Sequence, residues 1–512
     1  MASANPGRAI YQRLRVLPWA RLWAEEVPRF NQASSRERFE GVPVIRAVGV
    51  VFAESGPAMQ KEEVKAWLIS LLQDPEEKIR RYAMAALPKI GVGPEAEAEL
   101  LTLLQTTPSL REQKFLGQTL DKIGGAATLE ALGAMEGILP HTAQRVNASI
   151  ARGRGRGEIR MDVPISGLGR TRIHLRGRRG LEGILRQEVE GQGQFRVVDV
   201  KPGLVAVTSP APFTLGDLYA MRCFGSVGFV LGLVKPSSPD DALDAVATTL
   251  ASPMAVRLFE SLTLGPPRYR LGFIGKGHQR GAVRRVADRA YSLCPGILND
   301  AREAPWSIDV HPTRWGDSVE LRPRLSPDPR HAYRLDDVPA ASHPPLAACL
   351  ARLAGPMDNE CVWDPFCGSG LELVERALLG GVRTVHGCDV SAEAVAIAER
   401  NFSNAPVGSV EARFTCCDFR EYPDIAELRP GSLTLLISNP PLGRRVRIPN
   451  LRGLFDDLFA VAAEYLAPGG RLVFTNPFRM ESPQPTLQLT SRQVVDLGGY
   501  NCRVESYAKQ AR

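Results

Sequence analysis

The spacing of apolar residues divides the chain into segments of different predicted structure. Residues 1–140 place apolar side chains three and four positions apart, which is typical of amphipathic helices. An Arg/Gly-rich stretch, residues 141–165, predicts a flexible linker. Between 166 and 340, short runs that predict strands stand between helical stretches. In residues 341–512, short apolar runs alternate regularly with amphipathic stretches, which predicts an α/β fold.

The helical segment contains an internal repeat. LISLLQDPEEKIRRYAMAALPKIG, ending at Gly91, corresponds to LLTLLQTTPSLREQKFLGQTLDKIG, ending at Gly124, at an offset of 33 residues. Each copy predicts an apolar helix, a turn at Pro75 or Pro108, and a second amphipathic helix that ends at glycine. The pair resembles HEAT-type repeats, although any antiparallel helical bundle would show this pattern. We expect the region to dock a protein partner, because none of its residues suggests chemistry.

Five strand candidates occur in the last segment: CVWDPF, RTVHGCDV, EARFTCCDF, LTLLISNPP and GRLVFTNP. Helical stretches connect them, so we expect a doubly wound, largely parallel sheet with its ligand at the carboxyl ends of the strands. The tail after residue 484 can add strands at the sheet edge.

The first of these strands runs into a glycine-containing loop, DPFCGSG at 364–370. Its glycines allow a tight turn and a close approach of the backbone to a ligand. The loop is neither GxGxxG nor a phosphate-binding loop, because no GK[ST] follows, so a cofactor without phosphates is preferred. We expect the cofactor to contact Asp364, Phe366, Gly368 and Gly370.

The next two strands also end in acids. Asp389 stands where it can accept hydrogen bonds from both hydroxyls of a ribose, and Asp418 with Phe419 offers a carboxylate and a ring edge to an adenine. Three acids on consecutive strand ends would face one crevice. Together they predict a pocket for a nucleoside such as S-adenosylmethionine.

The fourth strand ends in Asn439-Pro440-Pro441. Two consecutive prolines remove two backbone donors and restrict φ, so this loop should be rigid and rich in free carbonyls. The side-chain oxygen of Asn439 and the carbonyl of Pro440 can accept both hydrogens of one planar NH₂ group. The amine lone pair would then point at an electrophilic methyl group, without a general base in the first step.

These motifs resemble the class I S-adenosylmethionine-dependent methyltransferases, in particular the amino-methylating branch with a (D/N)PP(Y/F/W) loop. DPFCGSG followed by NPP and a glycine is most similar to the THUMP-associated RNA guanine-N2 methyltransferases. GLEGILRQEV also resembles the opening helix of their ferredoxin-like unit, and RYRLGFIGKGHQRGAVRRVAD resembles the end of THUMP. The resemblance covers about residues 170–510. It implies methionine contacts for the glycine loop, the ribose and adenine roles above, and a THUMP-like region that grips RNA, typically tRNA.

One position departs from that family. Leu442 stands where the family usually has an aromatic residue, and a stacked base is worth about 1–3 kcal/mol. Leucine still offers an apolar face, and Phe478 is a candidate replacement ring. We expect the substrate to contact Leu442, Gly443 and the two flanking arginines, Arg444 and Arg445.

The positive charge is concentrated in the middle of the chain. Lys and Arg total 63 against 56 Asp and Glu, a net charge of +7, and residues 151–340 hold 28 of these bases and 20 of the acids. Arg285 and Arg289 would share one helix face. We expect RNA phosphates to bind Lys276, Arg280, Arg284 and Arg285, although a solvated helix face is the simpler alternative.

Composition excludes several classes of protein. The chain is 44% hydrophobic and 23% charged, close to a globular average, and no run approaches the ~18 apolar residues of a membrane span. The N-terminus has no apolar core typical of a secretory signal. Nine cysteines without paired CxxC spacing suit reduced thiols and offer no zinc site. We therefore expect a soluble, cytoplasmic protein without a metal.

The residues favour one function over two alternatives. The main hypothesis is an RNA guanine-N2 methyltransferase. The same Asn-Pro-Pro loop serves any planar amine, so adenine N6 in RNA or DNA is the first alternative. The second is an inactive RNA-binding scaffold, against which stand Asp364, Asp389, Asp418 and Asn439, since an inactive descendant has no chemical need for them.

Overall fold

The computed structural model describes residues 6–133, 140–153, 157–167, 171–235, 238–339, 341–443 and 448–511. The chain forms two compact units. Unit 1 comprises Met1–Glu158 and Val234–Val319, and unit 2 comprises Ile159–Leu233 and Glu320–Arg512.

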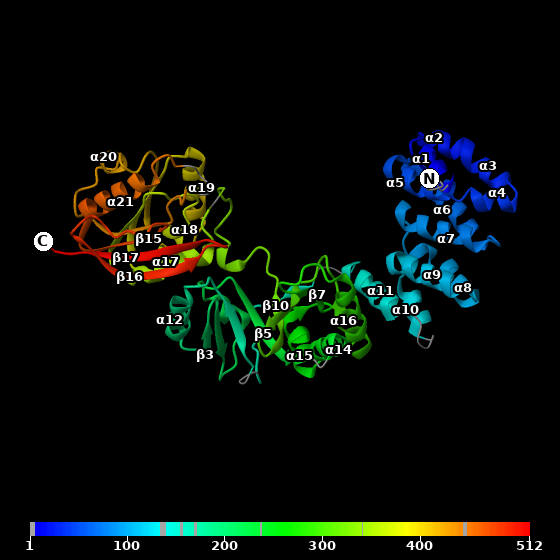
Figure 1. The fold of residues 1–512 in the computed structure, drawn as a ribbon, viewed down its shortest axis with the longest axis horizontal. Helices are drawn as coiled ribbons and strands as arrows, with labels where there is room; N and C mark the ends of the chain where they lie inside the picture. Colours follow the sequence, from blue (N-terminus) through cyan, green and yellow to red (C-terminus); the bar gives the residue numbers. More distant parts are fainter. Residues whose placement is uncertain are drawn as a thin grey trace. The chain divides into compact units, whose positions relative to one another are not determined.

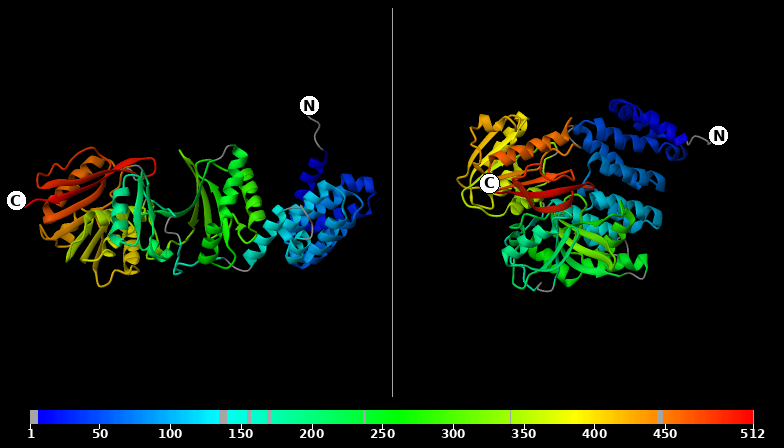
Figure 2. Two further views of the ribbon diagram at one scale, coloured as in Figure 1. Left: turned by 90° about the horizontal axis from the view of Figure 1, so that it is seen from below. Right: turned by 60° about the vertical axis from the view of Figure 1, so that its left-hand side comes forward.

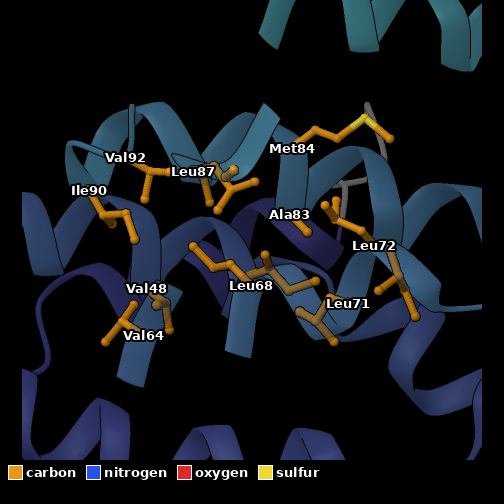
Figure 3. Close-up of a cluster of buried hydrophobic side chains, with 14 of the residues drawn as sticks. Val48, Val64, Leu68, Leu71, Leu72, Ala83, Met84, Leu87, Ile90 and Val92 are labelled. Atoms are coloured by element: carbon orange, nitrogen blue, oxygen red, sulfur yellow. The ribbon is translucent and has the colours of Figure 1, made fainter. Parts of the chain in front are cut away.

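The first part of unit 1 is helical (Figure 1). Short helices α1 (Pro6–Arg15), α2 (Trp19–Arg21), α3 (Val27–Gln32) and α4 (Ser35–Glu40) come before α5 (Pro43–Ser55). The following helices are α6 (Lys61–Ser70), α7 (Glu77–Ala86), α8 (Glu97–Thr106), α9 (Leu110–Ile123), α10 (Ala126–Gly133) and α11 (Pro140–Gly153). Apolar side chains of α5, α6 and α7 meet in one core (Figure 3), among them Val48, Val64, Leu68, Ala83 and Met84. Burial of each large aliphatic side chain contributes about 1.5–3 kcal/mol.

The two predicted repeat copies correspond to consecutive helix pairs, α6 with α7 and α8 with α9. Gly91 ends the first copy in the left-handed region, with φ of 72°, whereas Gly124 ends the second in an extended conformation. Arg80 joins the copies through two hydrogen bonds of 2.6 and 2.7 Å to the buried carboxylate of Glu112. The order of helix, proline-containing turn and second helix agrees with the expected one, and the HEAT-like assignment stays a prediction.

The structure differs from the predicted linker over residues 141–165. Residues 140–153 form helix α11, which packs against α9 and α16 and buries Val146, Ala148 and Ala151. The side-chain amide of Asn147 donates to Tyr291 Oη at 2.6 Å. A few alanines and one valine suffice for this contact face, and the Arg/Gly-rich run begins only at its end, at residue 151. Residues 154–156 lie outside the described ranges.

Unit 1 also contains a mixed sheet. Its strands lie in the order β10 (Gly316–Pro323), β9 (Trp306–Thr313), β7 (Arg268–Phe273), β8 (Leu298–Asn299), and β7 is parallel to β9 and β8. Strands β9 and β10 are neighbours in this sheet and are separated by two residues. Helix α16 (Arg280–Leu293) packs against β7 and β8, and α14 (Pro239–Leu250) packs against α16 and α15 (Pro253–Leu262) (Figure 1).

Among the residues that the structure places, no single helix has the length and apolar composition of a membrane span. One bent pair, Asp240–Leu250 with Pro253–Leu262, meets both criteria when its two helices are counted together across a 47° bend.

Unit 2 begins with an antiparallel sheet and a covering helix. The strand order is β3 (Arg196–Lys201), β4 (Leu204–Thr208), β2 (Ile173–Arg176), β5 (Ser226–Val234). Helix α12 (Glu182–Gln192) occupies the predicted position between β2 and β3, and α13 (Leu215–Tyr219) lies between β4 and β5. The inward-facing side chains of β2 and β4, such as Leu175 and Val207, are fully buried, as alternating strand patterns predict.

A seven-stranded sheet forms the C-terminal part of unit 2. Its strands are β11 (Glu360–Asp364), β12 (Val382–Asp389), β13 (Glu411–Cys416), β14 (Leu433–Ser438), β15 (Leu466–Asn476), β16 (Leu487–Asp496) and β17 (Asn501–Lys509). They lie in the order β13-β12-β11-β14-β15-β17-β16. The five predicted strands are parallel, and the C-terminal hairpin pairs antiparallel at the edge (Figure 2).

Helices cover both faces of this sheet, as expected of a doubly wound fold. Helices α17 (Pro344–Ala354), α18 (Leu371–Ala377) and α19 (Ala392–Ser403) lie on one face, and α21 (Leu451–Tyr465) lies on the other (Figure 1). The short helix α20 (Tyr422–Ile425) follows β13. Parallel strands covered on both faces are nearly continuous apolar runs, and Leu433–Ser438 shows this pattern.

The segment before α17 packs on the C-terminal sheet and its helices, although the predicted boundary placed it in the preceding region. The fully buried Asn401 accepts hydrogen bonds from the backbone N–H groups of Leu335 and Asp336, and donates to the carbonyl of Ser369 at 2.9 Å. Tyr333 Oη donates to Glu375 at 2.6 Å. These contacts place residues 333–336 with the C-terminal sheet, ahead of the predicted boundary at 341.

Candidate active site

Three strand ends bring the predicted motifs to one edge of the sheet. Asp364 at the end of β11 pairs in register with Gly387 of β12, and Trp363 pairs with Leu436 of β14. The loops after β11, β12 and β14 therefore leave the sheet on the same side. This is the crevice in which an open α/β sheet binds its ligand.

The carboxylate of Asp364 is completely buried at this edge. Its Oδ1 accepts from Ser438 Oγ at 2.6 Å and from the backbone N–H of Phe366 at 3.0 Å. Its Oδ2 has no hydrogen-bond partner among the residues that the structure describes. Burial, reinforced by the nearby charge of Glu372, raises the pKa of Asp364 well above its usual range. A buried acceptor in this state favours a donor supplied by a ligand.

The glycine loop and Asp389 are joined directly. The N–H of Gly368, whose φ is 51°, donates to Asp389 Oδ2 at 3.1 Å, and the N–H of Ser391 donates to Oδ1 at 3.0 Å. Gly370 begins α18 with φ of 82°, and a Cβ there would lie 3.2 Å from Ala398 Cβ. Both glycines are therefore required by backbone conformation, and the two N–H donors orient the Asp389 carboxylate.

The predicted adenine-binding pair has partners within the chain. Asp418 accepts from Arg420 Nη1 at 2.8 Å, and Arg420 also donates through Nε to Asp457 of α21 at 2.7 Å. The Phe419 ring is buried and packs against the Phe366 ring, with centroids 4.9 Å apart. The structure thus brings Phe366 and Phe419 together. The carboxylate of Asp418 is partly exposed and is hydrogen-bonded to Arg420.

Asn439 stands at the end of β14 with both ends of its amide bonded. Its Oδ1 accepts from Thr475 Oγ1 of β15 at 2.5 Å, and its Nδ2 donates to Ser342 Oγ at 2.8 Å. Ser342 Oγ in turn donates to Glu372 Oε1. Burial raises the pKa of Glu372 to about 7. Pro440 is buried beside this network, so the loop has a defined position.

The residues after the prolines lie against apolar side chains. Leu442 is half-buried and packs on the cluster that also receives Phe366 and Phe478. The Phe478 ring meets Phe455 edge-on at 5.4 Å. A Cβ on Gly443, whose φ is 76°, would lie 2.8 Å from Leu451 Cδ2. The predicted phosphate contacts, Arg444 and Arg445, lie outside the described residues.

The predicted basic face belongs to unit 1, and acids accompany most of it. Arg285 Nη1 lies 2.6 Å from Asp240, Arg289 Nε lies 2.7 Å from Asp244, and both acids come from α14. Arg284 pairs with Asp288 at 3.6 Å, and Lys276 pairs with Asp317 at 3.6 Å. Arg280 is exposed. The local sequence concealed this neutralisation, because α14 precedes α16 by about 45 residues.

Sequence patterns do not single out four side chains of this edge: Ser342, Glu372, Ser438 and Thr475. Serine and threonine are common at strand ends and in loops, so their types carry no signal. An acid in the first turn after the glycine loop was the one available hint, at Glu372. The others meet only through tertiary contacts over sequence separations of up to 97 residues.

Residues 331–485 match the family model described as RMKL-like, methyltransferase domain. This part of the chain is a methyltransferase domain. Two curated archaeal relatives, each named tRNA (guanine(10)-N2)-dimethyltransferase, match at 25% identity. The protein from Methanothermobacter thermautotrophicus aligns over 189 residues, which are 35% of this chain and 53% of the relative. The protein from Methanocaldococcus jannaschii aligns over 150 residues, which are 28% and 40%.

The chain therefore spans about half the length of the curated relatives that it matches. Among solved structures, TrmN from Thermus thermophilus superposes with a TM-score of 0.52 at 21% identity. The superposition covers 66% of this chain and 99% of that protein. Identity at this level supports a shared fold. The matched residues 331–485 contain the five parallel strands β11 to β15 of the seven-stranded sheet.

Proposed function

We propose that the protein transfers a methyl group from S-adenosylmethionine to an exocyclic amine of an RNA base, most specifically guanine N2 of a tRNA. The arrangement that carries this proposal is the Asn439-Pro440-Pro441 loop at the end of β14, beside the glycine loop and Asp389. The hydrogen-bond acceptors of the Asn-Pro-Pro loop lie at the same edge of one sheet as the glycine loop and Asp389, which would bind the nucleoside.

The residues present fit S-adenosylmethionine. Gly368 and Gly370 would lie against its methionine part, Asp389 would accept from the ribose, and Asp418 with Phe419 would flank the adenine. The unpartnered buried Oδ2 of Asp364 supports a ligand with an ammonium donor. When bound, the cofactor supplies an electrophilic methyl group on a sulfonium centre.

The loop residues orient the target amine. Asn439 Oδ1 and the Pro440 carbonyl would each accept one hydrogen of the NH₂ group, which favours a lone pair free of the ring and directed at the methyl group. No base is needed for this attack, since the amine proton becomes acidic only after the nitrogen is methylated. The contribution of Asn439 and Pro440 is thus orientation and electrostatic stabilisation.

Two further observations support RNA as the substrate class. The two curated relatives are named as tRNA guanine-N2 methylating proteins. Residues 151–340 carry the excess positive charge, and we assign THUMP-like RNA binding to this region.

The helical region of unit 1 is proposed as a HEAT-like docking surface for a protein partner. Nine free cysteines support a reducing, cytoplasmic setting.

The test is methyl transfer from radiolabelled S-adenosylmethionine to total tRNA, ribosomal RNA and genomic DNA, with Asn439→Ala as the matched variant. Label recovered from tRNA as N2-methylguanosine, and absent with the variant, supports the proposal. Label recovered as N6-methyladenosine would move the substrate to adenine. Cofactor binding by calorimetry without transfer to any pool would contradict the proposed substrate class, and failure to bind cofactor would favour an inactive scaffold.

A further inference from the structure

We propose that Thr475, Ser342 and Glu372 are positioning residues that hold the amide of Asn439 in one orientation, with its oxygen toward the target amine. This inference rests on the proposed function and adds three residues to it. None of them would touch the substrate or the reacting methyl group through the contacts described here. They would act through Asn439.

The three residues reach Asn439 from three separate elements. Thr475 lies on β15 and is fully buried, Ser342 precedes α17, and Glu372 lies in the first turn of α18. Their hydrogen bonds form one chain: Thr475 Oγ1 to Asn439 Oδ1 at 2.5 Å, Asn439 Nδ2 to Ser342 Oγ at 2.8 Å, and Ser342 Oγ to Glu372 Oε1.

The direction of each hydrogen bond follows from the chemistry of the groups. An ionised carboxylate only accepts, so the single hydroxyl hydrogen of Ser342 is directed to Glu372. The Ser342 oxygen then has only lone pairs for Asn439 and selects the NH₂ end of its amide. If the amide were flipped, its oxygen would face the Ser342 oxygen with no hydrogen between them.

The second lone pair of the Asn439 amide oxygen has a place in the proposed reaction. An amide oxygen has two lone pairs, and Thr475 uses one of them. The second is available to one hydrogen of the target NH₂ group. A flipped amide would instead present its own NH₂ to the amine, so that donors would oppose donors. Fixing the orientation before the substrate arrives avoids this state and its entropic cost.

The burial of Glu372 supports this role. Its side chain is 3% exposed, and none of the ion pairs among the described residues involves it. A buried carboxylate without a cationic partner is costly. Its neighbour Glu375 has a different position, because that carboxylate pairs with Arg222 at 2.6 Å and accepts from Tyr333. The contact of Glu372 with Ser342 leads instead to the Asn-Pro-Pro loop.

Three substitutions test the chain of hydrogen bonds in the full-length protein. Thr475→Val removes the hydroxyl with little change of shape, and Thr475→Ser restores it. Glu372→Gln places an NH₂ donor against Ser342, which frees the Ser342 hydrogen for the Asn439 oxygen. Thr434→Val is the matched control, because Thr434 lies at the other end of β14 and bonds to the Cys361 backbone.

We expect kcat for methyl transfer to fall about 10- to 100-fold in Thr475→Val and Glu372→Gln, as for a misplaced catalytic group. The Kd for S-adenosylmethionine, measured by calorimetry, should change less than about threefold. Thr475→Ser should recover most of kcat, and Thr434→Val should keep the wild-type rate. Equal losses in the control, or no loss in either test variant, would overturn the proposal. A lowered Tm shared by Thr475→Val and Thr434→Val would assign the effect to stability.

A second readout does not depend on activity. In protein labelled with ¹⁵N at asparagine side chains, the Asn439 NH₂ signal is assigned by its loss in Asn439→Ala. We expect slow exchange with solvent in the wild type and faster exchange in Glu372→Gln. An unchanged signal would overturn the positioning role. The expected NMR result without methyl transfer to any nucleic acid would instead contradict the proposed function and leave the amide orientation standing.

Discussion

The strand-end crevice of unit 2 and the arginine face of α16 in unit 1 differ in how their polar groups are satisfied. On α16 the most basic stretch of sequence is opposed by acids, with Arg285 and Arg289 each paired to α14. In the crevice, the buried Oδ2 of Asp364 has no partner among the described residues, and the half-buried Asn439 Oδ1 accepts one hydrogen bond and keeps a second lone pair. The contrast shows that a concentration of charged residues in the sequence is weaker evidence for a ligand site than a polar atom with a free lone pair in a crevice.

The largest expected effect comes from the crevice. Asn439→Ala should lower kcat for methyl transfer by about 10²–10³-fold, because it removes a preorganised acceptor of the amine. The Kd for S-adenosylmethionine should stay within a few-fold of wild type, since Asp389 and the glycine loop are unchanged. Single-turnover transfer and calorimetry measure the two quantities. An equal loss of both would contradict the separate roles of the two loops.

The pH dependence of transfer should follow Glu372, whose pKa is about 7. Below that pH the protonated carboxyl can donate to Ser342, so the orientation of Asn439 is no longer imposed. We expect kcat to fall by up to about tenfold per pH unit on the acid side of 7. The charges that bear on Glu372 are Glu375 on its own helix and, across the crevice, Asp364.

Stability should respond in the opposite direction. The folded-state pKa of Glu372 lies above its ordinary value of 4.5, so the folded protein binds more protons and this group stabilises it as the pH falls from 7 toward 4.5. Glu372→Gln should flatten both the rate profile and this part of the Tm profile. If kcat of Glu372→Gln still falls below pH 7, the fall is due to another titrating group, with Asp364 as the first candidate.

A smaller effect is expected at the rim of the crevice. Leu442→Tyr should lower the KM for RNA by up to about tenfold, because a stacked base is worth about 1–3 kcal/mol relative to alanine and leucine already supplies part of that contact. Leu442→Ile is the control for packing on the Phe366 and Phe478 cluster. If the KM of Leu442→Tyr rises while its Tm falls, the half-buried site lacks room for a ring. The role of Leu442 is then to pack against the apolar cluster and not to contact the base.

The smallest effect tests the arginine face. Asp240→Asn with Asp244→Asn should strengthen nonspecific RNA binding about two- to fivefold at low salt, because two guanidinium groups are released for phosphates. Tm should change little, since the exposed pairs contribute about 0–1 kcal/mol each. Fluorescence anisotropy over a salt series measures the change. Unchanged affinity and salt slope would show that RNA does not reach α16.

Sequence alone predicted most of the methyltransferase domain. Five strands, their connecting helices and the positions of Asp364, Asp389 and Asn439 at strand ends follow from apolar runs and from the residues that end them. The same holds for helix α12. These features depend on neighbouring residues in the chain, because hydrogen-bonding pattern, side-chain periodicity and the conformational limits of glycine and proline act locally.

Helix α11 and the placement of residues 333–336 with the C-terminal sheet required the tertiary structure. Residues 140–153 form an amphipathic helix, and the linker was predicted because the Arg/Gly-rich run that begins at residue 151 was extended back over it. The segment around Tyr333 belongs with the sheet because of Asn401 and Glu375, which lie far ahead in the chain. Such long-range hydrogen bonds leave no pattern in the segment itself.

Sequence by itself determined which chemistry the chain can carry: the glycine loop, the strand-end acids and the Asn-Pro-Pro loop. Only the tertiary structure decided how those groups are held and which charges remain for a ligand. Thr475, Ser342 and Glu372 converge on Asn439 from three elements, and α14 brings its acids to the arginines of α16. The physical reason is that hydrogen bonds and ion pairs between side chains depend on distances of a few ångströms, which packing sets and sequence order does not.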